Sequence, residues 1–284
     1  MVTVNDYVLK ETAWCPGCGN FGIREAVREA VVEMGLEPHQ VLFASGVGQA
    51  AKLPVYITGN TYTGLHGRTL PAAQGIKMAN PALKVFVFGG DGDGYAEGGN
   101  HLLHAIRRNV DLTYIVHDNQ VFGLTKGQAS PTSLEGYIAG MSPEGTRAPS
   151  FNPIPFAIAA DIGFVARSYS ADKKHLTSMI KAATEYQGFA LIDVLQPCVT
   201  FNKINTYKWY GERVYHLQED YDPTDKLVAF EKAHEFGDRI PLGIIYRSNR
   251  PAYIAGEGNT KEDPFVFRDH NPADFSFLND ENII

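Results

Sequence analysis

The sequence predicts an α/β fold built on a mostly parallel sheet with helices on both faces. Short runs of β-branched and aromatic residues, typical of buried strands, alternate with segments whose apolar residues recur at helical spacing. The clearest unit combines an apolar run (Val85–Phe88), a helical segment carrying Leu102 and Ile106, and a second apolar run (Leu112–Val116). Consecutive parallel strands need such a helical crossover, which places helices against the sheet.

The same alternation continues along the chain. Apolar positions from Ile23 to Met34 predict an amphipathic helix that ends at Gly35, and a strand follows at Val41–Ala44. After a loop rich in Gly, Thr and Tyr, we expect further helices and strands: helices at Ala72–Met78, Phe156–Ile162, His175–Tyr186 and near Thr224–Phe236, and strands at Phe164–Tyr169 and Phe189–Leu195. Several prolines mark residues 142–155 as a long excursion, a possible contact segment.

Length and composition fit one large domain. With 284 residues, 44% of them hydrophobic, the chain can bury a full core, which we place in residues 1–250. Residues 251–284 are rich in Pro, Asn and Asp and lack periodicity. We interpret them as a C-terminal arm, either lying over a neighbouring subunit or partly disordered.

Charge and cysteine content exclude several classes of protein. The net charge of −7 argues against a nucleic-acid-binding protein, which needs a basic face. The first residues lack the basic and apolar regions of a signal peptide, and no apolar run approaches membrane-spanning length. Three cysteines do not form a disulfide framework. We therefore expect a cytoplasmic protein with no membrane partner.

Polar residues follow the two strands of the central unit where each strand ends. Asp91 follows the first strand and Asn119 the second. Parallel neighbouring strands bring such residues to the same sheet edge, where ligands of open α/β sheets bind. A carboxylate, an amide oxygen and a loop carbonyl, for which Val121 is the candidate, are ligands that Mg²⁺ prefers beside phosphates. These residues predict a magnesium–diphosphate site.

Two other motifs permit alternative interpretations. The segment Gly46–Ala51 follows a strand and fits the G-x-G-x-x-A dinucleotide pattern, but Pro54 interrupts the helix that should follow. The Cys15-Pro16-Gly17-Cys18 segment has the spacing of a thioredoxin-type redox pair, although no strong strand precedes it.

Taken together, these segments resemble the beta subunit of 2-oxoacid:ferredoxin oxidoreductases, which are thiamine-diphosphate enzymes. The resemblance covers roughly the first 200 residues and PLGIIY at 241–246. It is carried by WCPGCGN, LHGRTLPAAQGIKMANP, GGDGDG with the later Asn119, GLTKGQ, SPTS and QPCVTFN. It implies a thiamine-diphosphate-binding fold and cofactor-binding residues at Val47, Gly48, Gln49, Ala50, His66, Gly92, Asp93, Gly123, Leu124 and Thr125. Asp93 is alternatively a helix cap. His66 and Lys126 are the candidate catalytic residues. Lys126 would bind either a phosphate of the cofactor or the carboxylate of the substrate.

The resemblance also implies an iron–sulfur cluster, with one departure from the family pattern. Cys15, Cys18 and Cys198 match three cluster cysteines, whereas Gln49 stands where the fourth is usual. Cubane clusters ordinarily have four thiolate ligands. Three outcomes stay open: a [4Fe–4S] cluster with a non-cysteine ligand, a three-iron cluster, or no stable cluster. We favour a cluster.

The implied reaction is CoA-dependent oxidative decarboxylation of a 2-oxoacid, of 2-oxoglutarate or pyruvate type, with ferredoxin as electron acceptor. An alpha or fused alpha/gamma subunit is the implied partner, because no glutamate for the cofactor's pyrimidine ring can be assigned here. One alternative is a non-oxidative 2-oxoacid decarboxylase. Another is a subunit that binds the cofactor only to organise a complex.

Overall fold

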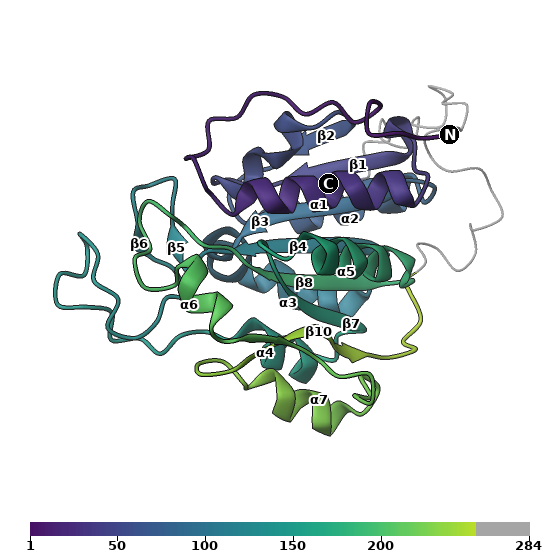
Figure 1. Cartoon of the computed structure of the whole chain (residues 1–284). Helices are drawn as coiled ribbons and strands as arrows, with labels where there is room; N and C mark the ends of the chain where they lie inside the picture. The colour runs from purple at the N-terminus through teal and green to yellow at the C-terminus, as the bar shows by residue number, and fades with distance from the viewer. Residues whose placement is uncertain (254–284) are drawn as a thin grey trace, which may run out of the picture.

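The computed structural model describes residues 1–253, and a large sheet forms its centre (Figure 1). Its strands are β1 (Val41–Ser45), β2 (Asn60–Thr63), β3 (Lys84–Gly90), β4 (Leu112–Asp118), β7 (Phe164–Tyr169), β8 (Phe189–Leu195), β9 (Val214–His216) and β10 (Ile240–Arg247). They lie in the order β2-β1-β3-β4-β8-β7-β10-β9. Neighbours pair in parallel except β10 and β7, so the predicted mostly parallel sheet is confirmed. A separate ribbon joins β5 (Val121–Phe122) to β6 (Gln128–Ala129).

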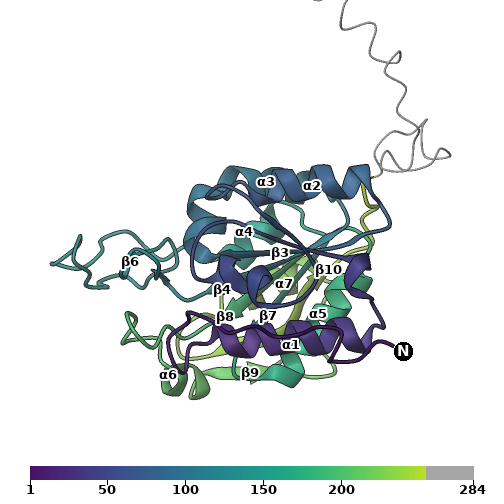
Figure 2. The same ribbon diagram turned by 90° about the horizontal axis from the view of Figure 1, so that it is seen from above.

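Helices cover both faces of the sheet (Figure 2). On one face lie α1 (Asn20–Glu33) and α5 (Lys173–Glu185), and on the other α2 (Thr69–Ala79), α3 (Gly99–Arg108), α4 (Pro153–Ala159) and α7 (Lys226–Ala233). The short α6 (Tyr207–Gly211) packs through Tyr210 in a smaller cluster with residues of β7, β8 and β10. No helix within residues 1–253 combines the length and apolar character needed to cross a membrane.

Strand β3 shows how one apolar run supplies two cores. Val85 and Val87 point into the core beneath α2 and α3, while Phe86 and Phe88 point into the core beneath α1 and α5. All four side chains are buried, because successive strand residues face opposite sides and both sides are covered. Each such burial contributes about 1.5–3 kcal/mol.

The structure differs from the expected elements at several places, among them β9, β10 and α6, which the sequence patterns did not predict. Residues 60–63 form the edge strand β2 rather than a loop; all four are exposed, so they lack the apolar alternation that marks a strand. Helix α4 begins at Pro153, not at Phe156, because Asn152 caps it and proline is compatible with a first helical turn. The predicted C-terminal arm lies largely at residues 254–284, outside the described part of the chain.

Candidate active site

A cavity of about 470 Å³ lies at the carboxyl ends of β1, β3 and β4; we name it the strand-end cavity. Its lining includes every residue that was predicted to bind the diphosphate cofactor or Mg²⁺, and it adds Gly90 and Phe122. Lys126 is outside this lining; it is exposed and has a positive φ of 80°. Three strand ends thus bring together segments that are far apart in the sequence.

Asp91 directly follows β3, lines the strand-end cavity and is 1% exposed. Its Oδ2 is 2.6 Å from the Thr132 hydroxyl, whereas its Oδ1 is buried without a hydrogen-bond partner. Burial is the main cause that raises the pKa of this carboxyl to about 6. A buried carboxylate oxygen without a partner is energetically unfavourable, and a bound cation would satisfy it.

Asn119 follows β4 and also lines the strand-end cavity. Its Oδ1 accepts the Val121 N–H at 3.0 Å, and its backbone carbonyl accepts the Asn202 side-chain amide at 3.2 Å. The next residue, Gln120, has a positive φ of 58°, which turns the chain sharply after the strand. A carboxylate, a side-chain amide and the Val121 segment therefore share one cavity, as Mg²⁺ coordination requires.

Asp93 connects two loops of the site. Its Oδ1 accepts the N–H groups of Val47 at 3.0 Å and Gly67 at 2.8 Å, and it lies 2.7 Å from His66 Nδ1. A Cβ at Gly46 would lie 2.2 Å from Asp93 Oδ2, so glycine is required for this close approach. The alternative prediction of Asp93 as a helix cap is wrong, because no side-chain cap bond forms at the π-helix Gly92–Glu97.

A second buried acid lies behind Asp91. Asp118 Oδ1 is 2.8 Å from the Thr132 hydroxyl that also contacts Asp91. One hydroxyl proton serves one carboxylate, so the other acid must itself donate to Thr132. Burial, then the nearby Asp193 and Asp91, raise the pKa of Asp118 well above its usual range. No sequence pattern marks Thr132 as part of the site, and the only signal for Asp118 is its position before Asn119.

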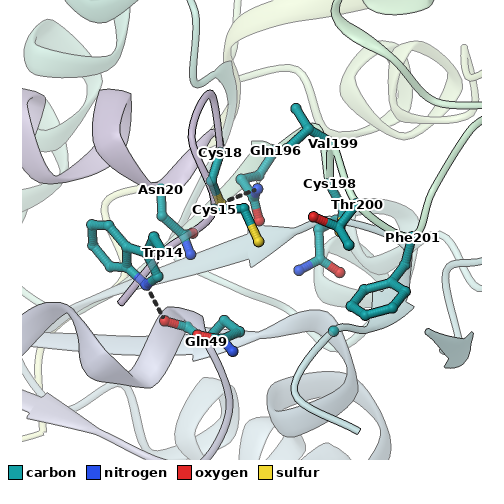
Figure 3. Close-up of a pocket in the computed structure, with 12 residues that line it drawn as sticks. Trp14, Cys15, Cys18, Asn20, Gln49, Gln196, Cys198, Val199, Thr200 and Phe201 are labelled. Carbon is teal, nitrogen blue, oxygen red and sulfur yellow. Dashed lines mark hydrogen bonds between the residues drawn. The ribbon is translucent and has the colours of Figure 1, made fainter. Parts of the chain in front are cut away.

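The three cysteines line a neighbouring cavity of about 400 Å³, the cysteine cavity (Figure 3). Cys15 and Cys18 precede α1, and the Gly19 N–H donates to the Pro197 carbonyl at 3.3 Å, which holds Cys18 near the Cys198 segment. Gln49 also lines this cavity, and its backbone carbonyl accepts the Trp14 Nε1–H at 2.9 Å.

The donor atoms of this cavity can be compared with the needs of a cluster. Burial, with smaller effects from Cys198 and Cys15, raises the pKa of the Cys18 thiol to about 11. The Gln49 Oε1 is buried without a hydrogen-bond partner. Within residues 1–253, no three His, Cys, Asp or Glu side chains converge to hold a metal ion. The cavity thus offers three cysteine sulfur atoms and one amide oxygen, whereas a cubane cluster ordinarily has four thiolate ligands.

Comparison with known proteins identifies the relatives of this chain. Residues 39–194 match the family described as thiamine pyrophosphate enzyme, C-terminal TPP binding domain. Residues 198–261 match the family described as the C-terminal part of the pyruvate ferredoxin oxidoreductase beta subunit.

Full-length relatives agree with these matches. The 2-oxoacid:ferredoxin oxidoreductase subunit beta of a Sulfolobus species is 45% identical, over 92% of this chain and 89% of that protein. The subunit of the same name from Saccharolobus solfataricus is 49% identical, over 83% of this chain and 81% of that protein. A structure of the 2-oxoglutarate:ferredoxin oxidoreductase from Magnetococcus marinus, with 2-oxoglutarate, coenzyme A and succinyl-CoA bound, superposes with a TM-score of 0.86 at 37% identity, covering 89% of this chain and 87% of that one. This chain therefore belongs to the beta subunits of the 2-oxoacid:ferredoxin oxidoreductases.

Proposed function

We propose that the strand-end cavity binds Mg²⁺ together with the diphosphate of thiamine diphosphate. Asp91, Asn119 and the Val121 carbonyl would hold the ion. The observation that carries this proposal is that the buried Asp91 Oδ1 has no hydrogen-bond partner. The side-chain amide of Asn119 and the loop at Val121 line the same cavity. Carboxylate and amide oxygens with phosphate are typical Mg²⁺ ligands.

The remaining lining residues would surround the cofactor: Val47, Gly48, Gln49, Ala50, His66, Gly92, Asp93, Gly123, Leu124 and Thr125. Asp93 acts here by fixing the loops of Val47 and Gly67 rather than by reaching the phosphate with its side chain. His66, which lines the cavity and lies beside Asp93, is our candidate for contact with the reacting groups. Lys126, exposed next to Thr125, would meet a phosphate or a substrate carboxylate.

The proposed reaction is CoA-dependent oxidative decarboxylation of a 2-oxoacid. The acid loses CO₂, coenzyme A receives the acyl group, and the released electrons pass one at a time to ferredoxin. Thiamine diphosphate, when bound, supplies the nucleophile and the electron sink. The structural relative holds 2-oxoglutarate and coenzyme A, which supports an acid of 2-oxoglutarate type, and the match to the pyruvate ferredoxin oxidoreductase beta subunit supports one of pyruvate type.

A partner subunit is part of this proposal. No glutamate occurs among the described residues that line the strand-end cavity. The cofactor needs a carboxylate against its pyrimidine ring, so an alpha or fused alpha/gamma chain would supply that half of the site. We expect the isolated chain to bind the cofactor but not to turn over substrate.

We propose that the cysteine cavity holds an iron–sulfur cluster through Cys15, Cys18 and Cys198. Three thiols that line one cavity support this assignment, and their like charges would repel as thiolates without a cationic centre. The buried Gln49 Oε1 is the candidate for the fourth position, although an amide oxygen binds iron more weakly than a thiolate.

The test uses the complex of this chain with its alpha partner. We expect 2-oxoacid-dependent formation of acyl-CoA together with reduction of ferredoxin. Asp91→Ala should remove nearly all of this activity through loss of Mg²⁺, while Asp220→Ala, at an exposed acid, should not. Aldehyde formation without an acceptor would instead identify a non-oxidative decarboxylase, and full activity of Asp91→Ala would identify an organising subunit.

A further inference from the structure

Thr132 is a buried threonine that contacts the proposed metal site from behind. It lies in the segment after β6, is 2% exposed and is not part of the strand-end cavity lining. It lines a different cavity together with Asp118. Its direct contact with the proposed metal ligands is the hydrogen bond to Asp91.

The contacts of Thr132 determine how the Asp91 carboxylate is oriented. The Thr132 Oγ1 lies 2.6 Å from Asp91 Oδ2, and Asp91 Oδ1 has no hydrogen-bond partner. The terminal torsion of aspartate is broad, so a hydrogen bond to one oxygen decides where the other one points. Here that bond occupies Oδ2 and leaves Oδ1 free for a ligand in the cavity.

The Thr132 hydroxyl is itself held in place by its surroundings. Its Oγ1 is also 2.8 Å from Asp118 and 3.3 Å from Ser130 Oγ, and its carbonyl accepts the Ser150 hydroxyl at 2.8 Å. The Phe151 N–H donates to the Pro131 carbonyl at 2.8 Å. Because both side chain and backbone are fixed, Thr132 can impose one orientation on Asp91.

We propose that Thr132 is the positioning residue for the divalent cation held by Asp91. This inference rests on the proposed Mg²⁺ site. Hydrogen-bond partners of metal ligands orient the ligands, and their loss typically lowers metal affinity about 10–100-fold. Thr132 acts through Asp91 and does not touch the ion or the cofactor.

The experiment measures Mg²⁺ binding to the full-length chain by calorimetry in the presence of thiamine diphosphate. Thr132→Val is nearly isosteric and replaces the hydroxyl by a methyl group that cannot hydrogen-bond, so it should weaken Mg²⁺ binding about 10–100-fold. Thr132→Ser keeps the hydroxyl and should bind like the wild type. Thr184→Val is the matched control, because Thr184 is a buried threonine on α5 whose hydroxyl bonds the Ile180 carbonyl at 2.7 Å.

Equal Mg²⁺ affinity of Thr132→Val and the wild type would overturn the positioning role and leave the metal site intact. Absence of Mg²⁺ binding by the wild type would instead overturn the metal site and this inference with it. Thermal unfolding without ligand separates a folding defect from a binding defect. Where Thr132→Val does not fold, Thr132→Ala makes the same comparison against Thr132→Ser.

Discussion

The carboxylate of Asp93 accepts the peptide N–H of Gly67 at 2.8 Å, which joins the end of β3 to the loop before α2. The same oxygen accepts the Val47 N–H from the loop after β1. Two loops that line the strand-end cavity thus depend on one side chain.

We predict that Asp93→Ala destabilises the chain, because it leaves the buried Gly67 N–H without an acceptor. An unsatisfied buried donor costs about 1–3 kcal/mol. Asp93→Asn keeps an oxygen acceptor at this position and should retain more stability. Urea denaturation of the two variants measures the difference, and an Asp93→Ala protein as stable as the wild type would contradict the prediction.

We predict that Gln49→Cys increases iron retention after anaerobic reconstitution. The new thiolate would complete the set of four that cubane clusters ordinarily have, whereas the wild type offers an amide oxygen. Iron analysis and EPR before and after exposure to a chelator provide the measurement. Gln218→Cys, which adds a thiol at an exposed glutamine outside this cavity, is the control. The cluster proposal fails if reconstituted wild type and Gln49→Cys both contain almost no iron.

We predict that His175 lowers stability in mild acid. Burial and the neighbouring His216 lower its pKa from 6.5 to about 4. Between these values the unfolded chain takes up a proton that the folded chain does not, so stability falls as the pH decreases from 6.5 towards 4. The ring is partly exposed, so we expect a loss on the order of 1 kcal/mol. His175→Gln should show a shallower decline in urea denaturation from pH 6.5 to 4.5; an identical decline would exclude His175 as its source.

We predict a large loss of stability when the buried ion pair between Arg167 and Asp193 is broken. Both side chains are almost fully buried, with Arg167 Nε 3.4 Å from Asp193 Oδ2 and the Tyr95 hydroxyl donating to Asp193 at 2.9 Å. Asp193→Ala leaves a buried guanidinium without its partner, which costs about 3–5 kcal/mol. The double variant Arg167→Met/Asp193→Leu should lose less stability than Asp193→Ala, because it leaves no buried charge without a partner. A double-mutant cycle in urea tests this, and strictly additive losses would argue against a coupled pair.

Local pattern predicted most of the fold because its strands are buried on both faces. Val85–Phe88 and Leu112–Val116 are continuous apolar runs, which any packing arrangement must bury. Edge strand β2 was missed because its four exposed residues carry no such constraint. The start of α4 was misplaced because Pro153 was interpreted as part of the excursion, whereas a cap by Asn152 allows proline there.

For the site, the sequence by itself determined which residue types stand at the strand ends: Asp91, Asn119 and the glycine-rich loops around them. Only the tertiary structure decided that Thr132 contacts Asp91 and Asp118, that Asp93 binds the loops of Val47 and Gly67, and that Lys126 stays outside the cavity. The physical reason is that strand ends are fixed by local hydrophobic pattern, whereas these hydrogen bonds join segments brought together by sheet order and by the packing of the intervening helices.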